Sequence, residues 1–153
     1  MYSTVFTAPA VEPIGIEDIG KTHIKVDADD EDSLLALFIQ AAREYVEDIT
    51  GRSLITQTRE VTLDHFPCTE TIRLSHGPVQ SITSVKYQDT EDSEQTLSAD
   101  SYWTDIKSNV ARIVIKNSWP ATKRRPNAVT IRFVSGYGAS ATTVPAALRE
   151  AVL

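Results

Sequence analysis

The change from a helical to an alternating hydrophobic pattern near residue 50 is the feature that most restricts the fold of this chain. Before it, apolar residues recur every three or four positions from about Glu31 to Ile49, which predicts one long amphipathic helix. After it, apolar and polar residues alternate in short segments separated by glycine, proline and aspartate, which predicts strands. Because the two patterns occupy separate parts of the chain, we expect an α+β fold, with the long helix and short helices packed beside antiparallel strands.

The predicted long helix has recognisable ends. Carboxylates crowd its start from Asp27 to Asp32, where they meet unpaired N–H groups and the positive end of the helix dipole. Gly51 suits the left-handed cap position at the other end. The apolar positions form one broad stripe, made of Leu34, Leu35, Phe38, Ile39, Ala41, Ala42, Tyr45, Val46 and Ile49.

The alternating part of the chain predicts seven strands, several of them in hairpins. The best defined is Val129 to Val134, where Val129, Ile131 and Phe133 alternate with more polar neighbours before Gly136-Tyr137-Gly138 ends the pattern. The other candidates are Ile55 to Leu63, Thr71 to Leu74, Ile82 to Gln88, Gln95 to Leu97, Tyr102 to Ile106 and Arg112 to Ile115.

We expect an extended N-terminal arm over residues 1–15, followed by one α+β domain over residues 16–153. The domain comprises a helical part (16–50), a strand-rich part (54–135) and a C-terminal helix (145–153). The helical part begins with a short helix from Ile16 to His23, weakened by Gly20. In the C-terminal helix, Pro145 occupies the first turn, where its missing N–H costs nothing.

Composition restricts the class of protein. A chain of 153 residues with 41% hydrophobic and 24% charged residues is typical of one soluble globular domain. The net charge of -6 argues against a protein that grips nucleic acid through its phosphates, although an acidic lumen would let a duplex slide past. We find no membrane-spanning segment, and the N-terminus lacks the pattern of a secretory signal, so we expect synthesis in the cytoplasm.

No catalytic, metal or cofactor site is predicted. The run from Asp27 to Asp32 does not fit a calcium loop, because Asp32 replaces the required glycine and Phe38 the required glutamate. His23, His65 and His76 are not at metal-ligand spacings. Cys68 is the only cysteine, has no identifiable activating base, and cannot form a disulfide within the chain. Gly136-Tyr137-Gly138 lacks the lysine and the spacing of a phosphate loop.

Two segments are candidates for contacts with other chains. Lys123, Arg124 and Arg125 form the only dense basic run, either as a solvated loop or as a contact to an acidic neighbour, such as Asp29, Asp30 and Glu31 of another subunit. The C-terminal helix is too short to be stable alone, so its apolar residues, including Leu148, Val152 and Leu153, need a surface to pack on.

Short sequences in a fixed order also carry a resemblance to a known family. They are Val26-Asp27, Asp30-Glu31-Asp32, Ala41-Ala42-Arg43, Thr50-Gly51-Arg52, Ile55-Thr56-Gln57-Thr58, Val79-Gln80-Ser81-Ile82, Ala111-Arg112-Ile113, Ser118-Trp119-Pro120-Ala121-Thr122, Arg124-Arg125-Pro126 and the segment from Val129 to Gly138. Together they resemble the gp6-like head-tail connector (adaptor) proteins of long-tailed bacteriophages.

The resemblance implies a structural adaptor of the virion, assembled in the host cytoplasm, and no catalytic step. Identical subunits, twelve in the family, would form a ring beneath the capsid portal. The ring would extend the channel for double-stranded DNA, without binding it specifically, and offer a docking surface for a stopper or tail protein. It also implies that the helix over 31–49 packs between subunits, that Arg124 and Arg125 contact the ring or the portal, and that Leu148, Val152 and Leu153 are anchors for the portal. Family members normally continue the C-terminal helix by a turn or more.

Two readings from other classes remain open. One is a small hydrolase with a site built from scattered acids such as Asp64, Asp89 and Asp105, although their spacing does not support it. The other is a monomeric module that captures a peptide on an exposed strand edge.

Overall fold

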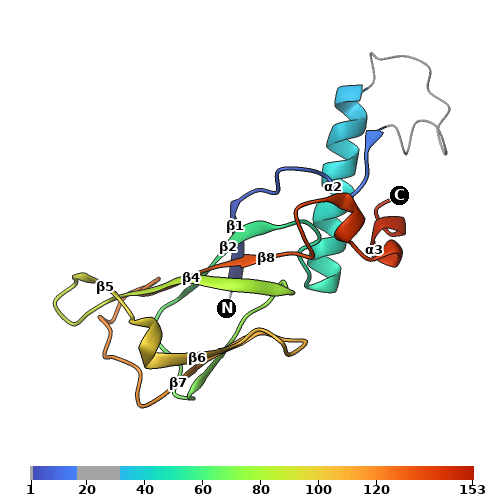
Figure 1. The fold of residues 1–153 in the computed structure, drawn as a ribbon. Coiled ribbons are helices and arrows are strands. Elements are labelled where there is room, and N and C mark those ends of the chain that lie inside the picture. The colour runs from blue at the N-terminus through green and yellow to red at the C-terminus, as the bar shows by residue number, and fades with distance from the viewer. Residues whose placement is uncertain (1, 17–31) are drawn as a thin grey trace.

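The computed structural model describes residues 2–16 and 32–153, and it consists of two antiparallel sheets with the two α-helices at one end (Figure 1). The larger sheet has the order β1-β2-β8-β4-β5 and the smaller sheet the order β3-β7-β6. The strands are β1 (Tyr2–Thr7), β2 (Gln57–Leu63), β3 (Thr71–Arg73), β4 (Val79–Gln88), β5 (Glu94–Thr96), β6 (Tyr102–Asp105), β7 (Arg112–Ile115) and β8 (Val129–Ser135). The helices are α2 (Asp32–Thr50), α3 (Ala146–Glu150) and the 3-10 turns η3 (Ala99–Ser101) and η4 (Ala141–Thr143).

The α+β class is therefore confirmed, and each of the seven predicted strands is present: the ends of β7 are as predicted, and those of the other six differ by one to three residues. The strand β1 was not predicted. Residues 2–7 of the expected arm pair antiparallel with β2 as an edge strand, with Ser3 opposite Val61. The predicted short helix over 16–23 lies outside the described residues, apart from Ile16. The division of the chain into one arm and one domain stays a prediction.

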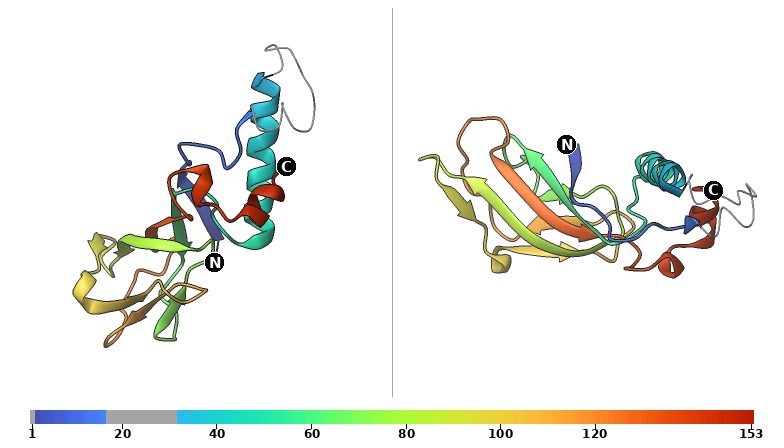
Figure 2. Two further views of the ribbon diagram at one scale, coloured as in Figure 1. Left: turned by 45° about the vertical axis from the view of Figure 1, so that its right-hand side comes forward. Right: turned by 90° about the horizontal axis from the view of Figure 1, so that it is seen from above.

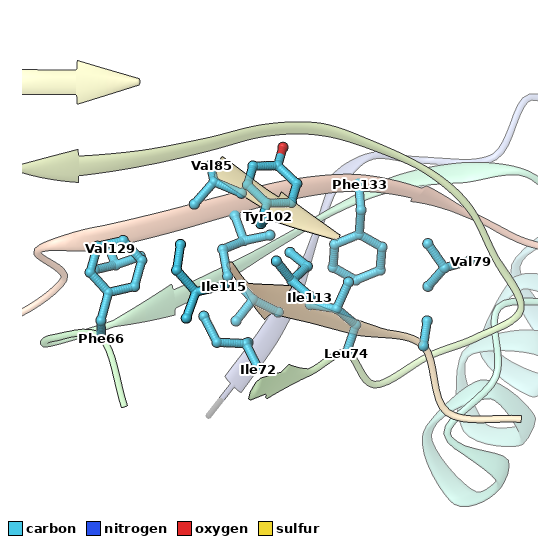
Figure 3. Close-up of a cluster of buried hydrophobic side chains, with 13 residues drawn as sticks. Phe66, Ile72, Leu74, Val79, Val85, Tyr102, Ile113, Ile115, Val129 and Phe133 are labelled. Atoms are coloured by element: carbon cyan, nitrogen blue, oxygen red, sulfur yellow. The ribbon is translucent and has the colours of Figure 1, made fainter. Parts of the chain in front are cut away.

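The two sheets pack face to face around an apolar core. In β8 the burial alternates along the strand as expected, with Val129, Ile131 and Phe133 fully buried. Figure 3 shows Val129 and Phe133 meeting side chains of the smaller sheet, among them Ile72, Ile113 and Ile115, and Ile131 belongs to the same cluster. The inward side chains of strands far apart in sequence thus build one sandwich core.

A second apolar cluster holds the helices on the end of the sandwich. It comprises Ile14, Val46, Leu54, Ile55, Val144 and Val152, with Ala42 and Leu148 packed against it. The two views in Figure 2 show α2 and α3 side by side at the same end of the molecule, away from most of the strands. Among the described residues, no helix is both long enough and apolar enough to span a membrane.

Glycines at two strand and helix ends have the conformations expected of them. Gly51 ends α2 with φ of 61°. Gly136 follows β8 with φ of 130°, and a Cβ there would lie 2.5 Å from backbone atoms of Ile55 and Thr56. No other residue fits this close approach, which confirms that the glycine lets the chain leave the last strand.

Two of the segments that carry the family resemblance, Thr50-Gly51-Arg52 and Val129 to Gly138, meet in space at Arg52. The guanidinium of Arg52 donates from Nη1 to the hydroxyl of Tyr137 at 2.9 Å and from Nη2 to Oδ1 of Asn109 at 2.7 Å. These bonds join the end of α2 to the segment after β8 and to the turn between β6 and β7. Arg52 therefore fixes the position of the β6–β7 hairpin relative to the helix.

Candidate subunit interface

The helix α2 is held on the sandwich by a mixture of apolar and charged side chains. Leu35, Ile39 and Val46 are buried, but so are Arg43 and Glu47, each with 3% of its surface exposed. Burying charges is costly unless they are paired and hydrogen-bonded, so this side of the helix must be satisfied by its neighbours.

Glu47 lies at the centre of this buried network. One of its carboxylate oxygens accepts from the backbone N–H of Leu54 at 2.7 Å, and both accept from Nε2 of Gln57, at 2.9 and 3.0 Å. Its charged neighbours are Nη1 of Arg43 at 3.4 Å and Nη1 of Arg59 at 3.9 Å. Because rotating the helix would leave the carboxylate buried without these partners, the network fixes which side of α2 faces outward.

Arg43 extends the network toward the N-terminus of the chain. Its Nε donates to Glu12 at 2.8 Å, so the segment before the long helix is held against it. The guanidinium therefore links two parts of the chain that are distant in sequence.

The outward side of α2 is apolar along most of its length. Five large side chains are between 49% and 67% exposed: Leu34, Leu37, Phe38, Tyr45 and Ile49. We call this set the α2 stripe. It follows about 22 Å of helix, since each residue adds about 1.5 Å. A contiguous exposed apolar surface of this kind marks a site of contact with another molecule.

The exposed charges of α2 are all acidic. They are Asp32, Glu44 and Asp48, while the one basic residue of the helix, Arg43, is buried. The α2 stripe is therefore an apolar surface with acidic neighbours.

A cleft of about 600 Å³ lies beside the C-terminal part of α2. Its lining includes Ser3, Asp48, Arg59 and His76. Burial lowers the pKa of His76 and the positive charge of Arg59 lowers it further, whereas Asp48, 3.9 Å from the ring, opposes both. The His76 imidazole, near the C-terminal end of α2, therefore stays neutral to a lower pH than a free histidine.

The predicted basic run forms an exposed loop between β7 and β8. Arg125 is paired with Asp92 of the same chain at 2.9 Å, while the side chains of Lys123 and Arg124 are exposed. Asp29, Asp30 and Glu31, suggested as a partner for this loop, lie outside the described residues. The loop belongs to the sheet end of the molecule in Figure 1, away from α2.

The C-terminal helix is shorter than predicted. It ends at Glu150, because the last turn tightens: the N–H of Val152 bonds to the carbonyl of Arg149. Val152 is turned inward and only 4% exposed, and Leu148 also packs against the helix cluster. In this conformation Val152 has almost no exposed surface, whereas Leu153 is exposed, and the expected contact of these residues with the portal stays a prediction.

The acids considered for a hydrolase are each hydrogen-bonded to other residues of the chain, Asp89 and Asp105 within local turns and Asp64 to a distant loop. Asp64 accepts from the backbone N–H of Asn127. The backbone N–H of Ser93 is the main cause of a lowered pKa at Asp89, and hydrogen bonds from Ser108 are the main cause at Asp105. Within residues 2–16 and 32–153, no three His, Cys, Asp or Glu side chains are grouped so that they could hold a metal ion.

Sequence reasoning found the apolar stripe but could not divide it into buried and exposed halves. It also missed Arg43 and Glu47. Their spacing of four residues, on the turns that carry Ile39 and Val46, was the available signal, because residues four apart lie on one side of a helix.

The fold and the surface together define a class of protein. Its described part has an exposed apolar surface along one helix, and the acids considered for a hydrolase are hydrogen-bonded to other residues of the chain. These features are those of a structural assembly subunit.

Comparisons identify the family. The profile of the phage gp6-like head-tail connector protein family matches residues 15–112, and the chain belongs to this family. It is therefore a structural connector protein of the virion, located at the head-tail junction. A comparison with curated proteins finds no match.

Solved structures share the fold. A chain from the neck of an empty GTA particle computed with C6 symmetry is 22% identical, with a TM-score of 0.83, and the match covers 99% of this chain and 80% of that chain. A chain from the virion of a native gene transfer agent (GTA) particle has 22% identity, a TM-score of 0.82 and the same coverage. A chain from the neck of a native GTA particle computed with C12 symmetry has 22% identity and a TM-score of 0.76, covering 99% of this chain and 79% of that chain.

Proposed function

We propose that this connector assembles as a ring of identical subunits beneath the capsid portal, packed through the α2 stripe. The observation that carries the proposal is the run of large apolar side chains exposed along α2, on a helix whose rotation is fixed by the buried Glu47 network. A monomer would gain nothing from exposing this surface, whereas a subunit interface would bury it. The C6 and C12 symmetries named for the neck structures that share the fold support a ring, and twelve subunits is the number proposed.

The role of the ring is mechanical. It extends the channel through which double-stranded DNA passes and presents a surface on which a stopper or tail protein docks. The net charge of -6 supports passage of DNA without strong binding, because like charges repel. The protein performs no catalytic step in this role.

Two further contacts are part of the proposal. The exposed Lys123 and Arg124, with Arg125 beside them, contact an acidic surface of the portal or of the adjacent subunit, for which Asp29, Asp30 and Glu31 are candidates. Leu153, which is 49% exposed, is the C-terminal residue best placed to contact the portal, while Leu148 and Val152 hold the helix that carries it.

The test is a matched pair of substitutions on α2, observed with and without portal protein. Phe38→Lys places a charge in the α2 stripe, and Gln40→Lys places the same charge about 160° around the same helix, given about 3.6 residues per turn. Gln40 is exposed and already bonds to Glu44, so a lysine there forms a favourable pair. We expect negative-stain microscopy and native mass spectrometry to show rings for the wild type and Gln40→Lys but not for Phe38→Lys. Monomers of the wild type under every condition, portal included, would refute the function.

A further inference from the structure

The hairpin β6–β7 presents a second exposed apolar surface. Trp103 is 59% exposed, Ile106 38% and Val110 50%. Trp103 lies on β6, opposite Val114 of β7, and Lys116 holds its ammonium 5.6 Å from the centre of the indole ring. A tryptophan this exposed, beside basic side chains, has the composition of an interface hot spot.

The charges around this hairpin are basic. Arg73 and Arg112 are directly opposite each other on β3 and β7, and Lys107 lies in the turn between β6 and β7. Asp105 is the one acidic residue of the three strands and this turn, and Arg112 neutralises it at 2.9 Å. We call Trp103, Ile106, Lys107, Val110 and Lys116, with Arg73 beside them, the hairpin surface.

The hairpin surface complements the α2 stripe in two independent respects. Both are apolar, so burying one against the other removes both from water. The exposed charges are opposite in sign: Asp48, three residues after Tyr45 and so on the same side of α2, is acidic, whereas Arg73, Lys107 and Lys116 of the hairpin surface are basic. The two surfaces belong to different elements, and the N-terminal half of α2 lies at the opposite end of the molecule from β6 and β7 (Figures 1 and 2).

We infer that the α2 stripe of one subunit packs against the hairpin surface of the next. This inference rests on the proposed ring and names its interface. Contact between two different surfaces of identical subunits is heterologous, and such contacts generate a ring when the rotation closes. The charges disfavour the competing pairing of α2 with α2, in which Asp48 would meet no exposed basic residue, because the one basic residue of the helix, Arg43, is buried.

Photo-crosslinking tests the pairing directly. The photoreactive residue p-benzoylphenylalanine replaces Phe38, and the variant is mixed with ¹⁵N-labelled wild type before assembly, with portal protein present. Mass spectrometry of the digest then identifies the labelled peptide joined to position 38. We expect labelled peptides from 102–116. If rings form but position 38 is joined to α2, to another labelled segment or to no labelled peptide, the pairing is refuted. The proposed ring is not affected by that result. Absence of rings from the wild type with portal refutes the proposed function itself.

Charge exchange and truncation give a second readout. Asp48→Lys and Lys107→Glu each reverse a charge on an exposed side chain, and we expect each variant alone to assemble rings less well. Mixing subunits that carry one change with subunits that carry the other should restore assembly.

Trp103→Ala should weaken subunit association at least about 30-fold, which corresponds to the roughly 2 kcal/mol of a hot spot. Since Trp103 is mostly exposed, the thermal unfolding of the Trp103→Ala monomer should match the wild type. Unchanged assembly by Trp103→Ala would contradict the inference.

Discussion

Replacing Glu47 by alanine should remove a large share of the stability of this protein. The substitution deletes a carboxylate that is 3% exposed and accepts from Leu54 and Gln57. It also removes the carboxylate that lies 3.9 Å from the buried guanidinium of Arg59, while Arg43 keeps its bond to Glu12. Breaking a buried ion pair by removing one partner costs about 3–5 kcal/mol of stability. Because Arg43 keeps its bond to Glu12, we expect Glu47→Ala to cost about 3 kcal/mol.

The loss is measurable by thermal and urea unfolding followed by circular dichroism. A loss of about 3 kcal/mol should lower the melting temperature by about 6–12 °C for a chain of this length. Alanine is the best helix former, so helix propensity does not contribute to the loss.

The control is Glu44→Ala on the same helix. The Glu44 side chain is 57% exposed and lies 3.6 Å from Arg43, so its removal should cost less than about 1 kcal/mol. If Glu47→Ala unfolds within about 0.5 kcal/mol of the wild type, or if Glu44→Ala costs as much, the buried network does not hold α2 in place.

Three further perturbations test other parts of the fold. Gly136→Ala should destabilise the protein by at least about 2 kcal/mol, because the new Cβ would lie 2.5 Å from the Ile55 backbone; normal urea unfolding would contradict this. Because His76 has a lowered pKa in the folded protein, the unfolded chain binds its proton first as the pH falls below about 6.5, and stability should decrease there. His76→Asn, which tolerates the φ of 62°, should show a smaller decrease between pH 7.5 and 5.5, and equal decreases would count against this cause. Val152→Ala should cost about 2 kcal/mol in urea unfolding, whereas Leu153→Ala should change stability by less than about 0.5 kcal/mol; the reverse order would mean that the C-terminus packs differently.

Local patterns along the chain were enough to define most of the elements. The spacing of apolar residues between Leu34 and Ile49 predicted α2, and the alternation from Val129 to Phe133 predicted both β8 and its buried face. These predictions succeed because the backbone geometry of a helix or a strand fixes which nearby residues share a side, so the pattern can be read from neighbouring residues alone.

The tertiary structure decided which of these residues remain exposed. Leu35 and Phe38 are equally apolar members of the predicted stripe, yet one is buried and the other 59% exposed. The difference depends on the Glu47 carboxylate meeting Leu54 and Gln57, and periodicity within a helix carries no information about such contacts. The apolar residues predicted along α2 cover more of the helix than the sandwich can contact, so only some of them are buried. Which residues form the exposed α2 stripe, and so the candidate interface, depends on how the helix is rotated on the sandwich.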